Sequence, residues 1–345
     1  MIPFYLVFLL LLSYALIDRK DQSKVIYYLF GITLIIFAAF RAEGIDNDYK
    51  GYIEYYDTIT NGQILIVEPS FMALSYAVKY IFNNVFFIFL FYALLGGTLK
   101  LIAIRQLTEL KFLTLLVYFS SYFLLFEMTQ IRAGVAAGAL LLCIKPMQER
   151  RLGKFLLFAF IAFLFHYSAL VIFPLYFISP NKINTKLYLA LVPAAYIMYF
   201  LRIDIFSLIN YLPIGLIQAK ISSYSFYAEQ DASINLFNVI QIFRCFVALI
   251  FIWKWELLLR HNAYAILLIK IYILGLFVFV AFANIPGISS RISELLLVVE
   301  IILIPFIFYI CKEKRLARLV ITIIALGFLT FSLFYTKLFL GYHFI

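Results

Sequence analysis

Four arginines lie in or beside long apolar stretches of the sequence, where charged side chains are rare: Arg41, Arg132, Arg244 and Arg291. A guanidinium group stays charged in proteins and binds phosphate through two parallel hydrogen bonds. An ionisable residue within a membrane segment is costly and is by default a functional-site hypothesis. The arginines therefore predict a site that binds a phosphorylated lipid head group.

Each arginine also has a structural interpretation, which stays open at this point. Arg41 directly follows an apolar segment, so its side chain can reach the membrane interface. Arg132 can form a local ion pair with Glu127 in a turn. Arg291 has Glu294 three residues later, a spacing that forms ion pairs on helices.

Arg244 lies midway along an apolar segment, where a side chain reaches the interface least easily, and this favours function. Lys270 and Glu300 lie on successive apolar segments at similar predicted depths, and we expect them to form a structural ion pair. Which role each charge plays depends on the elements that position it.

The composition is that of an all-α polytopic integral membrane protein. Of the 345 residues, 66% are hydrophobic and 13% are charged, whereas soluble proteins have about 45–50% apolar and about 25% charged residues. Long unbroken apolar runs exclude an outer-membrane barrel, whose strands alternate. The net charge of +10 comes from clusters between these runs, which is typical of cytoplasmic loops and argues against nucleic acid as a partner.

Apolar segments of the chain predict the membrane crossings, each of which needs about 20 residues. We expect segments at residues 3–17, 24–40, 69–82, 84–104, 112–126, 133–144, 155–165, 168–178, 187–201, 236–253, 263–284, 291–310 and 319–336. Residues 69–82 are expected to form an interfacial or re-entrant helix that does not cross fully.

Basic clusters set the sides of the membrane, because cytoplasmic loops are enriched in Lys and Arg. We expect clusters in the cytoplasm around residues 19–24, 100–111, 145–154, 182–186, 254–260 and 312–318. This path requires turns at residues 127–132 and 166–168. The result is about twelve crossings with both termini outside.

We expect one transmembrane domain over residues 1–345, with extracytoplasmic loops at residues 41–68 and 202–235. On this topology most of the polar residues in or beside the segments fall at the outer ends of helices: Arg41, Glu68, Glu127, Gln130, Arg132, His166 and Arg291. The second loop mixes aromatic residues with Ser and Asn, which suits sugar rings.

Several outer residues are candidates for a general base, which would accept a proton from a hydroxyl group: His166 first, then Asp48, Asp46 and Glu68. A lone histidine at a bend is often a packing residue, and this alternative stays open for His166. Asp46 and Asp48 form an Asp-X-Asp run, which holds a metal against nucleotide sugars in soluble enzymes. Nucleotide sugars are not available outside the cell, so we expect no metal site.

Five motifs give the chain a resemblance to the EpsG family of bacterial exopolysaccharide and O-antigen polymerases of Wzy type. They are FRAEGIDNDYKGY (residues 40–52), EPSF (68–71), TQIRAGVA (129–136), FHYSALVIFP (165–174) and SRISEL around Arg291. In the first motif the matching residues are Arg41, Gly44, Asp46, Asp48, Tyr49 and Tyr52. Thr129 and Ala133 depart from the family pattern, which often has Asn or Ser and then Gln at these positions.

The resemblance implies a GT-C-like, metal-independent glycosyltransferase of the bacterial inner membrane that needs no cofactor. It implies transfer of a growing glycan from undecaprenyl diphosphate to a new lipid-linked repeat unit, among membrane lipids, with a chain-length regulator as a possible partner. We expect catalysis from His166, Asp48 and Arg132. We expect diphosphate or substrate binding from Arg41, Arg132, Arg244, Arg291, Asp46, Tyr49, Tyr52, Glu68 and Gln130.

Two other classes of function are compatible with many helices and intramembrane arginines. A flippase for lipid-linked oligosaccharides is one, although transporters often have two-fold repeats and sites at the bilayer midplane. A membrane O-acyltransferase is the other, although it would need a catalytic histidine that an acyl donor reaches from the cytoplasm.

Overall fold

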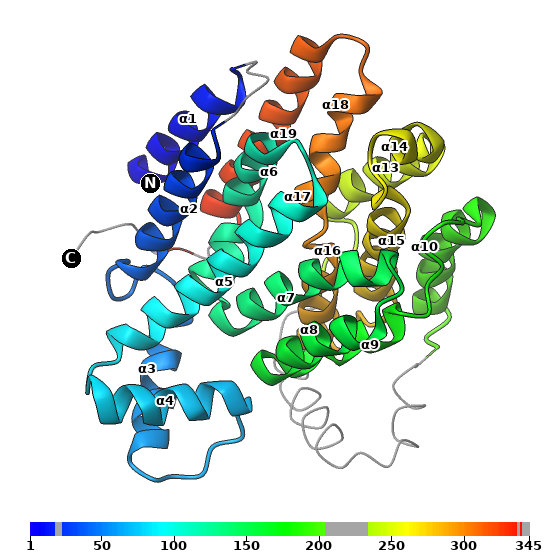
Figure 1. Cartoon of the computed structure of the whole chain (residues 1–345). Coiled ribbons are helices and arrows are strands. Elements are labelled where there is room, and N and C mark those ends of the chain that lie inside the picture. The colour runs from blue at the N-terminus through cyan, green and yellow to red at the C-terminus, as the bar shows by residue number, and fades with distance from the viewer. Residues whose placement is uncertain (18–22, 204–233, 337–338, 340–345) are drawn as a thin grey trace. The chain divides into compact units, whose positions relative to one another are not determined.

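The computed structural model describes residues 1–17, 23–203, 234–336 and 339 (Figure 1). In these ranges the chain is helical, and an isolated bridge joins Asp46 to Phe339. Most of the predicted loop at 202–235 lies outside the described residues. By length and composition, four described helices can span a membrane: Phe86–Leu107, Ile131–Gln148, Pro286–Ile310 and Lys314–Phe334. The protein is therefore an all-helical membrane protein, whereas the twelve crossings and the GT-C-like arrangement stay predictions.

The described chain forms two compact units. Unit 1 contains Met1–Leu170 and Ile301–Ile345, and unit 2 contains Val171–Glu300. The helices of unit 1 are α1 (Ile2–Ala15), α2 (Lys24–Ala39), α3 (Tyr49–Thr60), α4 (Pro69–Ile81), α5 (Phe86–Leu107), α6 (Lys111–Tyr118), a π-helix (Phe119–Glu127), α7 (Ile131–Gln148), α8 (Leu152–Phe165), a 3-10 helix (Ile304–Phe306), α18 (Ile307–Ile310) and α19 (Lys314–Phe334).

Unit 2 begins within a short 3-10 helix (Tyr167–Val171) and ends at the first residue of α17 (Glu300–Leu303). Its other helices are α9 (Ile172–Leu175), α10 (Thr185–Phe200), α13 (Val239–Trp253), α14 (Trp255–His261), α15 (Ala265–Ala281) and α16 (Pro286–Leu297). Almost every residue of α15 is buried, including Lys270 in its middle. The core of unit 2 therefore contains ionisable side chains.

Helices α5 and α7 form the centre of unit 1, and glycines bring their backbones close together. A Cβ atom added at Gly138 would lie 2.8 Å from the Cβ of Leu99, closer than side chains pack. On the other side of α5, a Cβ at Gly97 would lie 2.6 Å from Ile35 of α2. Small residues at such contacts allow close packing of helices in membranes. The close contacts at Gly97 and Gly138 hold α5 tightly between α2 and α7.

Two helices occupy the region predicted as an outer loop and a partial crossing. Buried residues three and four positions apart, Tyr49, Tyr52 and Tyr56, give α3 one apolar face. Pro69 begins α4, where its fixed φ suits the first turn. The 13 residues of α4 extend for about 20 Å, less than the hydrocarbon layer of about 30 Å. This length is compatible with the helix predicted for residues 69–82, whose place in the membrane stays a prediction.

Both predicted interruptions of the chain are present. The π-helix ends at Glu127 and α7 begins at Ile131, and Gly134 packs so closely on the Phe126 carbonyl that an added Cβ would lie 2.6 Å from it. The predicted turn at residues 127–132 is confirmed. At the second site, α8 ends at Phe165 and His166 is extended.

The crossing predicted for residues 168–178 is wrong. This stretch contains the end of a five-residue 3-10 helix and the four-residue α9. Together they are far shorter than the about 20 residues that a crossing needs. Pro174 lacks an amide hydrogen, and its ring opposes continuation of a helix from the preceding turn.

Candidate functional site

A buried ion pair joins the start of α7 to the residue before α4. Arg132 Nη1 donates a hydrogen bond to Glu68 Oε2, and the Glu68 side chain is 1% exposed. The other oxygen of Glu68 lies 3.3 Å from Nδ1 of His166, which follows α8. Glu68 therefore contacts a permanent cation with one oxygen and an imidazole with the other. The ring of Tyr52 also lies beside the Arg132 guanidinium group. We call Arg132, Glu68, His166 and Tyr52 the Arg132 cluster.

Aromatic rings surround the charged end of Arg132. Its guanidinium carbon lies 5.5 Å from the ring centres of Tyr52 and Tyr55, and 5.6 Å from that of Phe71. Such cation–π contacts stabilise a desolvated cation. Burial raises the pKa of Tyr52 to about 12, although the positive charge of Arg132 acts in the opposite direction. The Tyr52 hydroxyl is therefore protonated at neutral pH and able to donate a hydrogen bond.

A second buried pair lies at the start of α3. Arg41 Nε donates to Asp46 Oδ2 at 2.9 Å, and its guanidinium carbon lies 4.6 Å from the ring centre of Phe89. Tyr49 stacks on the same Phe89 ring, with 4.4 Å between centres. Burial raises the pKa of Asp46 more than the neighbouring Arg41 lowers it. Arg41 is thus enclosed by protein, which is not the snorkelling arrangement.

The Asp-Asn-Asp run builds a turn. The backbone N–H of Asp48 donates to Asp46 Oδ1 at 3.1 Å, and Asp48 is the residue before α3. Both oxygens of Asp46 therefore accept hydrogen bonds within the protein. Asp48 itself is half-buried, and its charge raises the pKa of Tyr52. Asp48 and Arg132 therefore both act electrostatically on Tyr52.

Unit 1 therefore contains most of the predicted site residues: Arg41, Asp46, Asp48, Tyr49, Tyr52, Glu68, Gln130, Arg132 and His166. Gln130 is the half-buried residue directly before α7. Sequence reasoning missed the rings of Tyr55 and Phe71. The sequence does contain a signal for these rings. Aromatic residues stand at positions 52, 55 and 56, ahead of the EPSF motif.

The alternative ion pair between Arg132 and Glu127 is wrong. Glu127 Oε1 instead accepts from Lys100 Nζ at 2.5 Å and from the Tyr118 hydroxyl at 2.9 Å. Lys100 is completely buried, so its predicted place in a cytoplasmic cluster is also wrong. The reason is that Lys100 lies well inside α5 and faces the turn, not the helix end.

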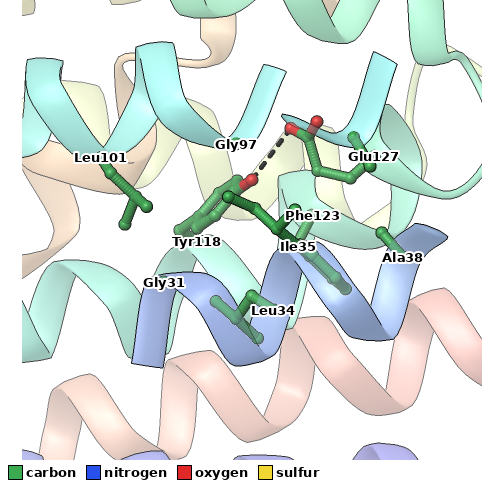
Figure 2. A pocket seen from close by; sticks show the side chains of 10 residues that line it. Gly31, Leu34, Ile35, Ala38, Gly97, Leu101, Tyr118, Phe123 and Glu127 are labelled. Carbon is green, nitrogen blue, oxygen red and sulfur yellow. Dashed lines mark hydrogen bonds between the residues drawn. The ribbon is translucent and has the colours of Figure 1, made fainter. Parts of the chain in front are cut away.

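Glu127 ends its helix, as predicted, but this end lies well inside the length of the neighbouring α5. The Glu127 carboxylate packs on Gly96, which leaves no room for a side chain there. Gly96 is ten residues along α5 from Phe86, or about 15 Å. Figure 2 shows Glu127 beside a small cavity of about 10 Å³, lined otherwise mostly by apolar side chains. The turn is therefore recessed along α5.

In unit 2, Arg244 forms an ion pair with Glu300. Arg244 Nη2 lies 2.9 Å from Glu300 Oε2, and Nε lies 3.2 Å from both oxygens. The Tyr272 hydroxyl donates to Glu300 Oε1 at 2.9 Å. Glu300 is completely buried. The predicted phosphate-binding role of Arg244 stays a prediction, and so does that of Arg291, which is half-buried in α16.

The predicted ion pair between Lys270 and Glu300 is wrong. Lys270 Nζ donates instead to the backbone carbonyls of Ser179 and Lys182, at 2.7 and 2.5 Å. Similar depth on neighbouring segments does not determine which way a side chain points. Here the lysine binds the loop after α9, and the glutamate binds an arginine of α13.

Together, these observations define an all-helical membrane protein in which charged side chains from well-separated motifs form buried pairs. The model of the EpsG family matches residues 24–344, nearly the whole chain. The chain belongs to the EpsG family, a Wzy-type polymerase-like family. Neither a curated protein nor a solved structure matches it significantly.

Proposed function

We propose that the protein is a metal-independent glycosyltransferase that polymerises oligosaccharide repeat units carried on undecaprenyl diphosphate. The reaction would take place at the outer face of the bacterial cytoplasmic membrane. Membership of the EpsG family supports a polymerase-type membrane function. The observation that carries the proposal is the Arg132 cluster, in which a fixed cation, a carboxylate and an imidazole lie together.

The donor half of the reaction uses Arg132. A guanidinium group has five N–H donors, and within the described residues Nε of Arg132 has no hydrogen-bond partner. The leaving group is the lipid-linked diphosphate, which gains negative charge as its bond to the sugar breaks. A preorganised cation in a water-poor site stabilises that charge. The aromatic rings around Arg132 hold it in place without neutralising it.

The acceptor half of the reaction needs a base. In the proposed step, His166 accepts the proton of the acceptor hydroxyl while that oxygen bonds to the anomeric carbon of the donor. The anomeric carbon–oxygen bond to the diphosphate breaks, and its electron pair goes to the phosphate oxygen. The nearby Glu68 carboxylate stabilises the imidazolium that forms. Asp48, at the start of α3, is the alternative base.

The test uses purified protein in lipid nanodiscs with one synthetic lipid-linked repeat unit. We expect a ladder of products that differ by one repeat unit, because each product can serve as donor again. Arg132→Ala should abolish the ladder, and Arg151→Ala should not, since Arg151 is an exposed residue at the start of α8. A wild-type protein that moves the lipid across the bilayer or acylates it, without lengthening the glycan, would refute the proposal.

A further inference from the structure

Lys100 contacts both sides of the turn that precedes Arg132. Its Nζ lies 2.5 Å from Glu127 Oε1, on the residue that ends the π-helix. The same Nζ donates to the backbone carbonyl of Gly134, in the first turn of α7, at 2.5 Å. Arg132 lies between these two contacts in the sequence. Lys100 therefore joins the chain before the turn to the chain after it.

The contacts of Lys100 are buried and specific. The Lys100 side chain is 0% exposed and that of Glu127 is 2% exposed, which makes water a poor substitute for either partner. Tyr118 donates to the same oxygen of Glu127, so three elements meet there (Figure 2 shows the Tyr118 bond). Burying an ion pair is costly, and such pairs often contribute less to stability than apolar residues would. The burial of the pair alone does not assign it a role, which follows instead from the elements that its contacts join.

The elements on each side also restrict the turn. Gly134 lies against the Phe126 carbonyl, where an added Cβ would be 2.6 Å away. Gly96 of α5 leaves space for the Glu127 carboxylate. With these glycines, Lys100 fixes the turn against α5 in one position. The direction in which Arg132 leaves α7 is set by the same short stretch.

We propose that Lys100 is a positioning residue that orients Arg132 toward the donor diphosphate. This inference rests on the proposed function. Lys100 does so through two contacts, the ion pair with Glu127 and the hydrogen bond to the Gly134 carbonyl. The second contact is the important one, because it ties α7 directly to α5 two residues beyond Arg132. A shift of about 1 Å at a catalytic group can cost about 100-fold in rate.

Two variants separate positioning from simple charge balance. Glu127→Gln removes the carboxylate charge but keeps the Lys100 amine, which still donates to the Gly134 carbonyl. The double variant Lys100→Met with Glu127→Gln removes both charges and also the contact to Gly134. If the pair acts only through its charge balance, Glu127→Gln, which leaves the Lys100 charge buried without its partner, should lose more activity than the double variant, which carries neither charge. If Lys100 positions the turn, only the double variant should lose activity strongly.

We expect kcat of repeat-unit transfer, per folded protein, to fall less than about 10-fold in Glu127→Gln and about 100-fold in the double variant. The KM for the acceptor should change little in either. The matched control is Lys145→Met with Glu149→Gln, which removes a largely exposed pair at the C-terminal end of α7. A kcat of Glu127→Gln equal to or below that of the double variant would overturn the proposal.

Amide hydrogen exchange in nanodiscs gives a second readout that requires no activity. We expect exchange at residues 128–134 to be at least about 10-fold faster in the double variant than in Glu127→Gln, with exchange in α19 unchanged. Unchanged exchange at the turn would overturn the positioning role even if kcat fell. A wild-type protein that makes no polymer would instead refute the proposed function, and the exchange result would still report on Lys100.

Discussion

Each unit contains an arginine–glutamate pair, and the two pairs are alike in burial. The side chains of Arg132 and Glu68 are 16% and 1% exposed, and those of Arg244 and Glu300 are 19% and 0% exposed. They differ in what else the carboxylate contacts. Burial of an ion pair therefore does not by itself identify a site.

In unit 2, Arg244 and the Tyr272 hydroxyl donate to both oxygens of Glu300. This is the pattern of a satisfied structural pair, in which every strong acceptor has a donor. In unit 1, Glu68 faces the imidazole of His166, a side chain that can accept a proton. The comparison points to chemistry at Glu68 and to stability at Glu300, and the predictions below test that division.

The largest effect is expected from Arg132. Arg132→Ala and Arg132→Lys should each reduce polymer formation by about 100-fold or more, as loss of a transition-state donor does. Lysine fails because an ammonium group does not bind a diphosphate with two parallel hydrogen bonds. Product ladders per folded protein provide the measurement, with Arg151→Lys as the control. Full activity in Arg132→Lys would show that Arg132 acts only through its charge and not through two parallel hydrogen bonds.

Loss of the histidine should have the next largest effect. His166→Ala should lower the transfer rate by about 100-fold, the lower end of what a general base contributes. The variant should also lose the fall in rate at acidic pH that protonation of an imidazole base causes. Rate–pH profiles would show this, with His261→Ala as the control because His261 is exposed on α14. If His166→Ala keeps the wild-type fall in rate at acidic pH, His166 is not the base, and Asp48 becomes the candidate.

Breaking the pair in unit 2 should affect stability more than chemistry. Arg244→Met leaves Glu300 buried without its cation, which should cost about 3–5 kcal/mol of stability. Adding Glu300→Gln should recover part of that loss. Thermal unfolding in detergent measures the stability, and transfer rate per folded protein should change less than about 10-fold. A 100-fold loss of rate in the stable double variant would show that Arg244 belongs to the reaction site.

The smallest effect should come from the Tyr52 hydroxyl. Tyr52→Phe keeps the ring beside Arg132 and removes one hydrogen bond, worth about 0.5–1.5 kcal/mol. We expect a loss of rate below about 10-fold. Because burial raises the pKa of Tyr52 to about 12, the variant and the wild type should have parallel rate–pH profiles up to about pH 10. The exposed Tyr80 provides the control, as Tyr80→Phe.

Much of this arrangement could be predicted from the sequence, because the local signals were strong. Charged and amide side chains within a long apolar run predict an interruption, and the helix breaks between Glu127 and Ile131. The EPSF and FHYS motifs contain the two partners of the Glu68–His166 contact. Local patterns, however, give no information on which partners meet across elements.

The ion-pair predictions that failed required such long-range information. Lys100 and Glu127 are paired because a π-helix and two glycines bring them together, and no spacing rule predicts that. Depth alone pairs Lys270 with Glu300, whereas the direction of its side chain brings Lys270 to backbone carbonyls. Residues 168–178 are apolar enough for a crossing, yet Pro174 and the break at His166 leave only short helices.

The most direct test of the account is the affinity for undecaprenyl diphosphate, measured by equilibrium binding in nanodiscs. A hydrogen-bonded charge is worth about 1.5–3 kcal/mol, so the account predicts a Kd about 10- to 100-fold higher for Arg132→Ala than for wild type. Arg151→Ala should bind as the wild type does. Equal Kd values for Arg132→Ala and wild type would contradict the claim that Arg132 holds the diphosphate.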